Sequence, residues 1–207
     1  MCGIAGVYNL NKQPVAKQYV QRMADVLAHR GPDSDGVYVD GPIGLAHRRL
    51  AILDTSSLGA QPMASKNDEW VIVFKELREE LQQQGYSFVS RTDTEVIAEG
   101  LSAYGPDFFQ RLNGMFAIAA WNKKQQCLYM SRDRFGIKPL YYWFNGRTLV
   151  FGSEIKAIIT HPDYKMGVDH AALNHYFSFQ NVFSYNTLFQ GVTMLPPANT
   201  VVINADS

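Results

Sequence analysis

Two hairpin patterns in the second half of the chain constrain its fold most strongly. Apolar residues run through 115–121 and return through 127–130, and a second pair of apolar runs covers 139–144 and 148–151. The second pair is separated by Asn145-Gly146, which is a strong hairpin signal between apolar runs. Hairpins create antiparallel sheets, whereas a doubly wound parallel sheet would need helices alternating with every strand. We therefore expect an α+β domain with antiparallel sheets.

Other apolar patterns surround these hairpins with further strands and helices. We expect strands at residues 2–8, 37–39, 44–52, 70–74 and 200–204. Apolar residues at helical spacing over 20–27 predict a helix, which ends at the stop signal Gly31-Pro32. Further helices are expected at 75–84, from residue 92 onward, at 153–160 and at 169–177. Thr92 and Glu95 have the spacing of a capping box at the start of the helix expected from residue 92 onward.

Composition places the chain among globular domains without an obvious charged partner. It has 207 residues, of which 46% are hydrophobic. Nineteen basic and nineteen acidic residues cancel, so binding to nucleic acid or to a membrane surface has no electrostatic support. The sequence has neither an apolar run of about 18 residues nor a secretory signal, and we expect a cytoplasmic location. Two cysteines make no disulfide framework, and Cys127 is interpreted as a small core residue of a strand.

Cys2 directly follows the initiator methionine. Met1 is expected to be removed because the next residue is small, and the mature chain would then carry a thiol and a free α-amine on one residue. The thiolate is the reactive form of cysteine, and an N-terminal amine is a recognised base for activating such a nucleophile. Cys2 is therefore a candidate catalytic nucleophile. The alternative is a processed N-terminus that happens to hold cysteine.

The junction between Phe74 and Lys75 violates the local rules of chain geometry. Phe74 ends a strand pattern and Lys75 starts a helical pattern, with no turn residue between them. Strand-to-helix loops normally take two to six residues, and helices prefer to start after Ser, Thr, Asp or Asn. A segment is therefore missing from the pattern at this point.

An ordered series of motifs carries a family resemblance. It comprises Cys2-Gly3-Ile4-Ala5-Gly6, His29-Arg30-Gly31-Pro32-Asp33, Leu45-Ala46-His47-Arg48-Arg49-Leu50-Ala51-Ile52-Leu53-Asp54, Gln61-Pro62-Met63, Thr92-Asp93-Thr94-Glu95-Val96-Ile97, Asn113-Gly114-Met115-Phe116-Ala117, Arg132-Asp133-Arg134-Phe135-Gly136-Ile137-Lys138-Pro139-Leu140-Tyr141-Tyr142 and Gly152-Ser153-Glu154-Ile155-Lys156-Ala157. Together they resemble the N-terminal glutaminase domain of glutamine-hydrolysing asparagine synthetases, which are class II glutamine amidotransferases. The resemblance covers essentially residues 1–207.

The resemblance implies both a fold and a reaction. The fold is that of the N-terminal-nucleophile hydrolases, a four-layer αββα sandwich of two antiparallel sheets between helical layers. In the reaction, Cys2 attacks the carboxamide of glutamine, ammonia leaves, and water hydrolyses the γ-glutamyl thioester. In the family, ammonia then travels to a C-terminal synthetase domain, which makes asparagine from aspartate and ATP. That domain is absent from these 207 residues, and ATP and magnesium are expected there and not in the glutaminase domain.

The family pattern also assigns substrate-binding residues. Arg49 matches the position that binds the substrate's α-carboxylate, and a guanidinium offers a planar fork to such a group. Asp93 matches the position that holds the α-ammonium, while Asp also suits a helix cap. The backbone of Leu50, Ala51, Ile52 and Leu53 resembles the segment that lines the glutamine pocket. On a strand His47 and Arg49 share one face, so Arg48 is expected on the other, in a solvent-facing or structural role.

The chain departs from the family at the Phe74–Lys75 junction. Family members carry Asn-Gly-Glu-Ile-Tyr-Asn there, and this segment supplies an Asn side chain and a Gly N–H to the oxyanion of the tetrahedral intermediate. Either the deletion is real, or a mobile loop has been left out between Phe74 and Lys75. The intact motifs around the gap favour the second alternative.

Several interpretations stay open at this level. The ammonia acceptor could differ from aspartate, or the chain could be a non-catalytic glutamine-binding domain that lacks the oxyanion loop. The segment 29–33 is interpreted as a helix stop and turn that supports the pocket. Arg132, Asp133, Arg134 and Lys138 form either an ion-paired loop core or part of the contact with a second domain. We find no metal-ligand spacing and no phosphate loop, and a homodimer is left open.

Overall fold

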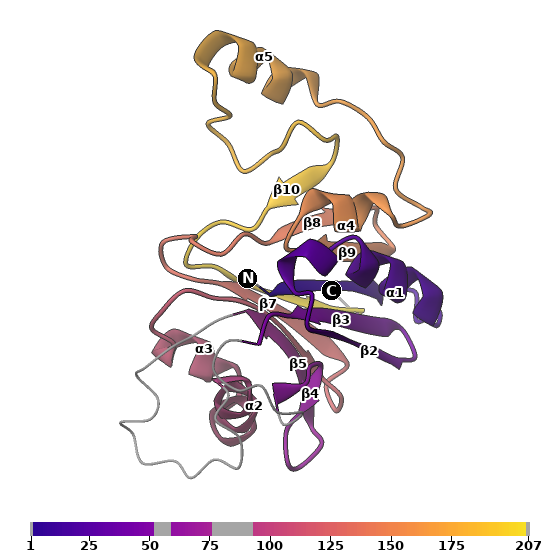
Figure 1. Ribbon diagram of the computed structural model, residues 1–207, viewed down its shortest axis with the longest axis vertical. Helices are drawn as coiled ribbons and strands as arrows, with labels where there is room; N and C mark the ends of the chain where they lie inside the picture. The colour runs from indigo at the N-terminus through magenta and orange to yellow at the C-terminus, as the bar shows by residue number, and fades with distance from the viewer. Residues whose placement is uncertain (1, 52–58, 76–92, 206–207) are drawn as a thin grey trace.

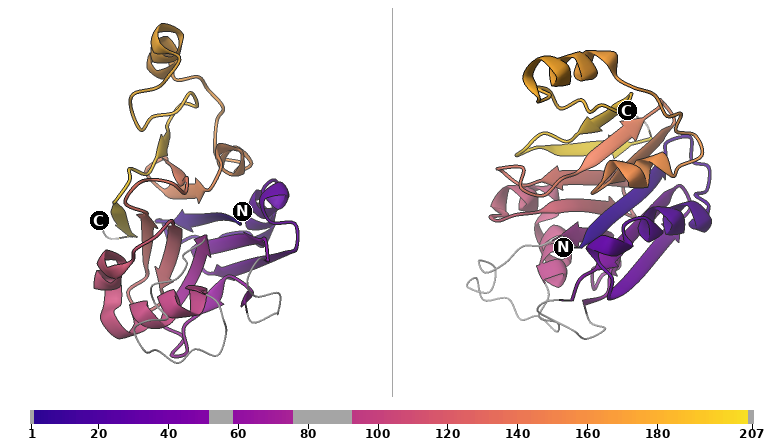
Figure 2. Two further views of the ribbon diagram at one scale, coloured as in Figure 1. Left: turned by 60° about the vertical axis from the view of Figure 1, so that its left-hand side comes forward. Right: turned by 45° about the horizontal axis from the view of Figure 1, so that its top comes forward.

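The computed structural model describes residues 2–51, 59–75 and 93–205, which form two stacked β-sheets with helices on their outer faces (Figure 1). Every strand pairing among these residues is antiparallel. The second view in Figure 2 shows the strands of the two sheets lying beside each other with the helices outside them. The structure therefore confirms the expected α+β sandwich of two antiparallel sheets between helical layers.

Sheet A has the strand order β10-β8-β9-β1-β3-β2, and sheet B has the order β11-β7-β6-β5-β4. The strands of sheet A are β1 (Gly3–Asn9), β2 (Ser34–Asp40), β3 (Ile43–Arg49), β8 (Tyr141–Phe144), β9 (Thr148–Gly152) and β10 (Val192–Met194). Those of sheet B are β4 (Met63–Ala64), β5 (Trp70–Lys75), β6 (Ala117–Asn122), β7 (Cys127–Arg132) and β11 (Thr200–Asn204). The strand that follows Cys2 thus lies inside sheet A, between β9 and β3.

Helices cover the outer face of each sheet. Apolar side chains of α1 and α4 pack on sheet A, and those of α2 and α3 pack on sheet B. The helices are α1 (Lys17–Asp25), α2 (Asp93–Tyr104), α3 (Phe108–Arg111), α4 (Ile155–Ile159) and α5 (His170–Phe179), with short 3-10 turns η1 (Ala28–Arg30) and η4 (Gly105–Asp107). Helix α1 follows the predicted apolar positions, since Val20, Met23 and Ala24 are its buried residues.

The two sheets meet in an apolar layer that excludes water. Tyr8 of sheet A and Trp121 of sheet B are both fully buried there, and their rings meet edge to face with centroids 5.1 Å apart. Burial of such large aromatic surfaces contributes strongly to stability. Cys127 lies on the other face of sheet B, in the layer beneath α2 and α3, where it is 4% exposed. This confirms its prediction as a core residue, and burial raises the pKa of its thiol.

Both predicted hairpins are present as β6–β7 and β8–β9. The first turns through Gln126 at a φ of 51°, and the second turns through Gly146, whose φ of 89° suits glycine. Three short elements, β4, β10 and α3, were not predicted. They span two to four residues each, which is too short to show a periodic pattern.

The predicted helix beginning at residue 75 is wrong at its first residue. Lys75 is the last residue of β5, because the strand keeps its register with β6 through the pairs Phe74–Ile118 and Lys75–Ala117. Strand pairing therefore continues unbroken across the junction where a segment was expected. Residues 76–84 lie outside the described part of the chain. The strand predicted over 44–52 ends earlier, at Arg49.

Helix α5 lies on an arm that stands away from the sandwich (Figure 1). The arm, residues 162–191, rejoins sheet A where β10 pairs with β8. Asp169 caps α5, since its side chain accepts a hydrogen bond from Ala172 N at 2.9 Å. Ala172 is the one residue of α5 that is buried.

His47 is a polar residue buried between the sheets at one end of the sandwich. It is 1% exposed, and it forms a hydrogen bond with the backbone of Phe74 in sheet B. Its Nε2 atom has no hydrogen-bond partner among the described residues. Burial lowers the pKa of His47 to about 3, and the nearby charge of Arg49 adds to this shift. The ring is therefore neutral near neutral pH.

Acidification should destabilise the fold through His47. The unfolded chain binds a proton on this ring near pH 6.5, whereas the folded chain does so only near pH 3, so the free energy of unfolding falls as the pH is lowered between these values. The slope from one such group is at most about 1.4 kcal/mol per pH unit. Urea unfolding across this range should show a shallower slope for His47→Gln than for the wild type. An unchanged slope would contradict the buried neutral ring.

Candidate active site

Cys2 lies immediately before β1, at the end of sheet A marked N in Figure 1. Its side chain is half-buried. The Sγ atom is 3.4 Å from the backbone N of Leu50 and 3.7 Å from the carbonyl O of Leu50. The Leu50 N–H thus points at the sulfur, which is the atom that would carry negative charge in a thiolate. The structure therefore brings two of the predicted site residues into direct contact.

Arg49 is the last residue of β3 and directly precedes Leu50. It lies on the same face of the strand as His47, and its charge acts on that ring. Arg48 takes the opposite face, where it donates to Ala24 O at 2.9 Å and to Asp25 Oδ1 at 2.7 Å. The alternation predicted for these residues is confirmed, and Arg48 has the structural role expected of it.

The segment after β3 is fixed by a turn from the 29–33 motif. Ala51 N donates to Asp33 Oδ2 at 2.7 Å, and Asp33 N donates to Arg49 O at 3.1 Å. Gly31 is required beneath this strand, because a Cβ atom there would lie 2.4 Å from the backbone of Arg48. The motif therefore supports the predicted pocket segment, as interpreted from the sequence. The predicted residues Ile52 and Leu53 lie outside the described residues.

Asp93 is the first residue of α2 and is partly buried. The next residue, Thr94, accepts a hydrogen bond through Oγ1 from Gln61 Nε2 at 2.8 Å. Gln61 Oε1 accepts from Phe74 N at 2.7 Å, so one amide joins the start of α2 to the end of β5. Thr92, the other half of the predicted capping box, lies outside the described residues.

The backbone of Phe74 therefore connects the two halves of the candidate site. It forms one hydrogen bond with Gln61, which also bonds the residue after Asp93, and another with His47, which lies on the same strand face as Arg49. Cys2, Arg49 and Leu50 form one group, and Asp93 is linked to them through these intermediates. Sequence reasoning did not identify Gln61 as this link, although its motif had been singled out.

Arg30 contacts the backbone of Cys2, whereas Leu50 contacts its sulfur. Its Nε donates to Cys2 O at 3.2 Å, and its Nη1 donates to Glu154 Oε1 at 2.5 Å. Burial alone would raise the pKa of Glu154, but hydrogen bonds from Arg30, His29 and Lys156 outweigh it and lower the pKa to about 2. These contacts join two motifs that lie 124 residues apart in the sequence. Both motifs were recognised from the sequence, but the contact between Arg30 and Glu154 was not predicted.

The loop after β7 is held by its own buried charges. Asp133 is fully buried and accepts from the backbone N atoms of Phe135, Ile137 and Lys138 at 2.9–3.1 Å. Arg132 donates to the carbonyl groups of Lys138 and Leu195 at 2.8 and 2.6 Å. These contacts are with backbone groups and support the interpretation of a loop core, while its predicted ion pairing stays a prediction. The loop leaves Phe135 and Ile137 exposed at its surface.

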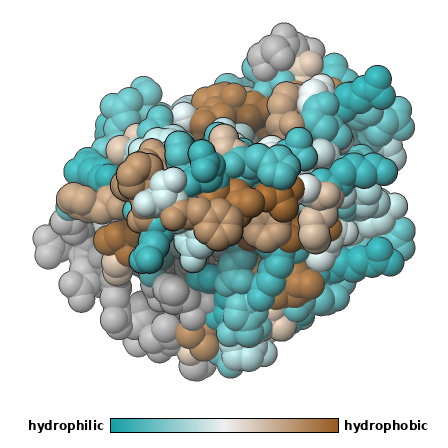
Figure 3. Space-filling model, turned by 90° about the horizontal axis from the view of Figure 1, so that it is seen from above, coloured by the Kyte–Doolittle hydropathy of each residue, from teal (hydrophilic) through white to brown (hydrophobic). Residues whose placement is uncertain are grey.

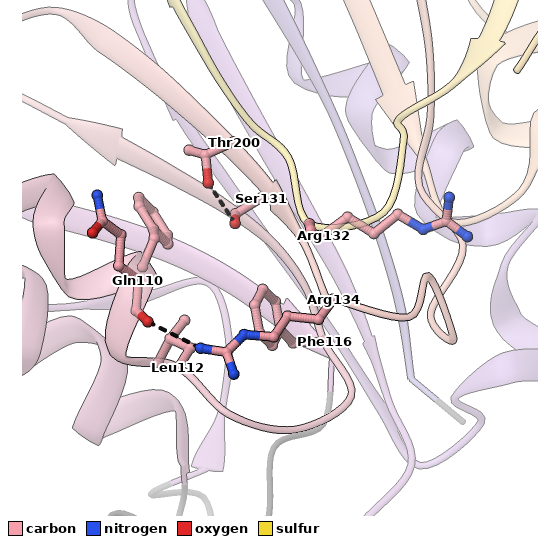
Figure 4. A pocket seen from close by; sticks show the side chains of 9 residues that line it. Gln110, Leu112, Phe116, Ser131, Arg132, Arg134 and Thr200 are labelled. Atoms are coloured by element: carbon pink, nitrogen blue, oxygen red, sulfur yellow. Dashed lines mark hydrogen bonds between the residues drawn. The ribbon is translucent and has the colours of Figure 1, made fainter.

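A pocket of about 260 Å³ lies beside this loop, on the outer face of sheet B (Figure 4). Its lining includes Phe109, Leu112 and Phe116. Ser131 Oγ and Thr200 Oγ1 form a hydrogen bond of 2.8 Å in its wall, and Arg134 Nη2 donates to Gln110 O at 3.4 Å. None of the predicted site residues lines this pocket.

Neither a metal-binding cluster nor a membrane-spanning helix is present among the described residues. Within them, no three His, Cys, Asp or Glu side chains are grouped so that they could hold a metal ion. No helix among them is long and apolar enough to cross a membrane.

Comparisons with known proteins agree with the geometry. A model of the glutamine amidotransferase domain family matches residues 1–207. The asparagine synthetase (glutamine-hydrolysing) 3 of Bacillus subtilis is 38% identical over 217 residues, covering 100% of this chain and 35% of that protein. The asparagine synthetase (glutamine-hydrolysing) 1 of the same organism is 38% identical over 218 residues, covering 100% of this chain and 34% of that protein. The chain thus spans about a third of the length of these relatives.

The fold has counterparts among solved structures. The glutamine phosphoribosylpyrophosphate amidotransferase of B. subtilis matches 99% of this chain and 48% of its own, with a TM-score of 0.67 and 20% sequence identity. At that identity the likeness concerns the fold alone. The family match over residues 1–207 and the relatives at 38% identity establish the family as well as the fold. The chain belongs to the glutamine amidotransferase domain family.

Proposed function

We propose that this chain hydrolyses glutamine to glutamate and ammonia, with Cys2 as the nucleophile. The observation that carries the proposal is the position of Cys2 in a glutamine amidotransferase domain. Its sulfur contacts Leu50, the residue directly after Arg49, at one end of the sandwich. A thiol in contact with the residue after an arginine can attack the amide of a substrate whose carboxylate that arginine binds.

The proposed reaction has two covalent steps. The Cys2 sulfur bonds to the side-chain carboxamide carbon of glutamine while its proton passes to the α-amine freed by removal of Met1. The carbon–nitrogen bond then breaks, and the amine returns the proton to the leaving ammonia. Water attacks the resulting γ-glutamyl thioester, which releases glutamate and restores the thiol. His47 is a poor candidate for the base because burial keeps its pKa near 3.

Substrate binding is assigned to groups on both sides of Phe74. Arg49 would bind the α-carboxylate of glutamine through two parallel hydrogen bonds. Asp93 would accept the α-ammonium at the start of α2. Leu50 and Ala51, which are fixed by contacts with Cys2 and Asp33, would line the pocket between them.

A second candidate function follows from the sequence at the Phe74–Lys75 junction. The Asn-Gly segment that supplies oxyanion donors according to the family resemblance is not present there. Loss of one such donor typically costs on the order of 10²–10³ in rate. The second candidate is therefore a glutamine-binding domain with very slow turnover. The alignment with the B. subtilis relative is 217 residues long, longer than this chain, so that relative carries additional residues within the matched region.

The ammonia would pass to a second domain. The relatives extend well beyond the matched third of their length, and their names state that they are asparagine synthetases. We assign to this domain the use of aspartate, ATP and magnesium. We also assign the arm as a docking face for it, because Met166, Phe177, Phe179 and Phe183 are each more than 60% exposed. Figure 3 looks onto the molecule from the arm's side and shows apolar side chains gathered on this face.

Replacing the nucleophile should stop the reaction. Cys2→Ser is expected to reduce ammonia release from glutamine to the background rate while leaving the unfolding midpoint in urea unchanged, because the half-buried side chain keeps its shape. A chain with an uncleaved N-terminal extension should be equally inactive, because its α-amine is tied up in a peptide bond. Coupled measurement of glutamate and ammonia checks both variants. Retained ammonia release in Cys2→Ser would rule out the mechanism.

Replacing Arg49 or Asp93 should weaken glutamine binding without changing the reactivity of the Cys2 thiol. Arg49→Ala and Asp93→Ala should each weaken glutamine affinity roughly ten- to a hundredfold, since a charge-assisted contact is worth about 1.5–3 kcal/mol. Alkylation of Cys2 by iodoacetamide should be unaffected. Arg48→Ala is the matched control on the opposite face of β3, and it should lower stability without changing affinity. Equal glutamine affinity in Arg49→Ala and the wild type would show Arg49 to be purely structural.

The arm should matter for the partner domain alone. Phe177→Gln and Phe179→Gln should leave glutamine hydrolysis unchanged, because the arm stands away from Cys2. Each should weaken binding to the separately produced remainder of the B. subtilis relative by about tenfold or more, as expected for central apolar contacts. Phe144→Gln, an exposed aromatic on β8, is the control for calorimetric titration. Equal affinity in all three variants would remove the arm from the interface, and dimerisation of the chain through the arm would replace the assignment.

A further inference from the structure

On one edge, the residues that begin β1 are held by single residues outside the neighbouring strand, through both backbone and side-chain hydrogen bonds. The pairing of β1 with β9 begins at Ala5, which is opposite Gly152. Beyond that point the chain of β9 leaves the sheet at Ser153. Ser153 N donates to Ile4 O at 2.9 Å, and Ser153 Oγ accepts from Ile4 N at 3.0 Å. A single residue therefore completes the edge next to Ile4.

Arg30 completes the same edge at Cys2. Its Nε donates to the Cys2 carbonyl oxygen at 3.2 Å. Its side chain is 11% exposed and packs over Gly3, where an added Cβ would lie 3.3 Å from Arg30 Cδ. The glycine after Cys2 thus leaves room for the guanidinium to lie along the backbone.

Glu154 binds the guanidinium group of Arg30. It follows Ser153 directly, so both anchors of the strand come from one corner of the chain. Its Oε1 accepts from Arg30 Nη1 at 2.5 Å and lies 3.0 Å from His29 Nε2, while its Oε2 is 3.2 Å from Lys156 Nζ. The low pKa of Glu154 keeps the carboxylate charged throughout the physiological pH range. A largely buried guanidinium would be costly without this partner.

A nucleophile at the start of a chain has a peptide bond on one side only. Terminal residues are poorly ordered unless other contacts hold them, whereas catalysis needs reacting atoms within a fraction of an ångström. Two holds on Cys2 are described: the contacts of its sulfur with Leu50 and the hydrogen bond from Arg30 to its carbonyl group. The second hold fixes the backbone from which both the thiol and the α-amine project.

We propose that Glu154 is a positioning residue for Cys2, acting through Arg30 to fix the Cys2 carbonyl group and hence the direction of the thiol and the α-amine. The inference rests on the proposed role of Cys2 as nucleophile. Glu154 does not touch the substrate in this account. Its effect should therefore appear in the rate of the covalent step and not in glutamine affinity.

The test compares Glu154→Gln, Arg30→Lys and the double variant. Gln keeps the shape of the side chain without its charge, and Lys lacks the fork that bonds Cys2 and Glu154 together. The readout is labelling by a glutamine analogue with an electrophilic carbon in place of its amide. Each single variant should lower the maximal labelling rate of Cys2 roughly ten- to a hundredfold, with unchanged half-saturation. The double variant should match the single ones, because both changes remove one linkage.

Two controls separate positioning from general damage. Glu154→Asp keeps the charge at a shorter reach and should recover part of the labelling rate. Asp25→Asn removes one of the two carboxylate partners of Arg48 and should leave the labelling rate unchanged. A drop in unfolding temperature for Glu154→Gln with a wild-type labelling rate would overturn the proposal, and so would additive effects in the double variant.

A spectroscopic readout stays valid even if the wild-type chain is not labelled at Cys2, which would count against the proposed function alone. The Cys2 carbonyl group is bonded to the amide nitrogen of Gly3, so loss of its hydrogen bond should shift the Gly3 amide signal in nuclear magnetic resonance spectra. Glu154→Gln and Arg30→Lys should shift it alike, and Asp25→Asn should not. A Gly3 signal that is the same in Glu154→Gln and the wild type would overturn the positioning role independently of any activity.

Discussion

The hold on Cys2, the residue that we propose as the nucleophile, is the constraint on which the proposed site depends. Cys2 cannot be placed by the strand alone, because β1 begins at Gly3. The neighbouring strand β3 delivers the backbone of Leu50 to its sulfur, and the turn after α1 delivers Arg30 to its carbonyl group. The interior position of β1 between β9 and β3 gives these contacts a rigid base. Contacts from two separate parts of the fold thus hold Cys2 in place.

The second constraint is the junction of the two sheets at Phe74. His47 reaches across from β3 to its backbone, while Gln61 ties the same backbone to the start of α2. The groups assigned to the α-carboxylate and the α-ammonium of glutamine are thereby placed relative to each other through one strand end. The resemblance places the oxyanion segment at this strand end, where β5 ends at Lys75. In the proposed function, different residues would therefore support glutamine binding and turnover.

Local patterns predicted most of the fold, and long-range contacts account for what they missed. The hairpins, α1 and the alternation of His47, Arg48 and Arg49 follow from periods of two and 3.6 residues. Lys75 was misassigned because its pairing with Ala117 in the sheet overrides the helical pattern of the sequence that begins there. The motifs named candidate site residues by resemblance, but the pairing of Arg30 with Glu154 joins residues 124 positions apart. No local pattern carries that information.

The central claim is that glutamine becomes covalently attached to Cys2, and it can be tested directly. The chain is mixed with glutamine, quenched rapidly in acid, and analysed by intact-mass spectrometry and peptide mapping. The account predicts a glutamyl adduct on a peptide that begins at Cys2 without Met1, and no adduct on the buried Cys127. Ammonia release at full rate from a chain that retains Met1, or that never carries an adduct on Cys2, would contradict it.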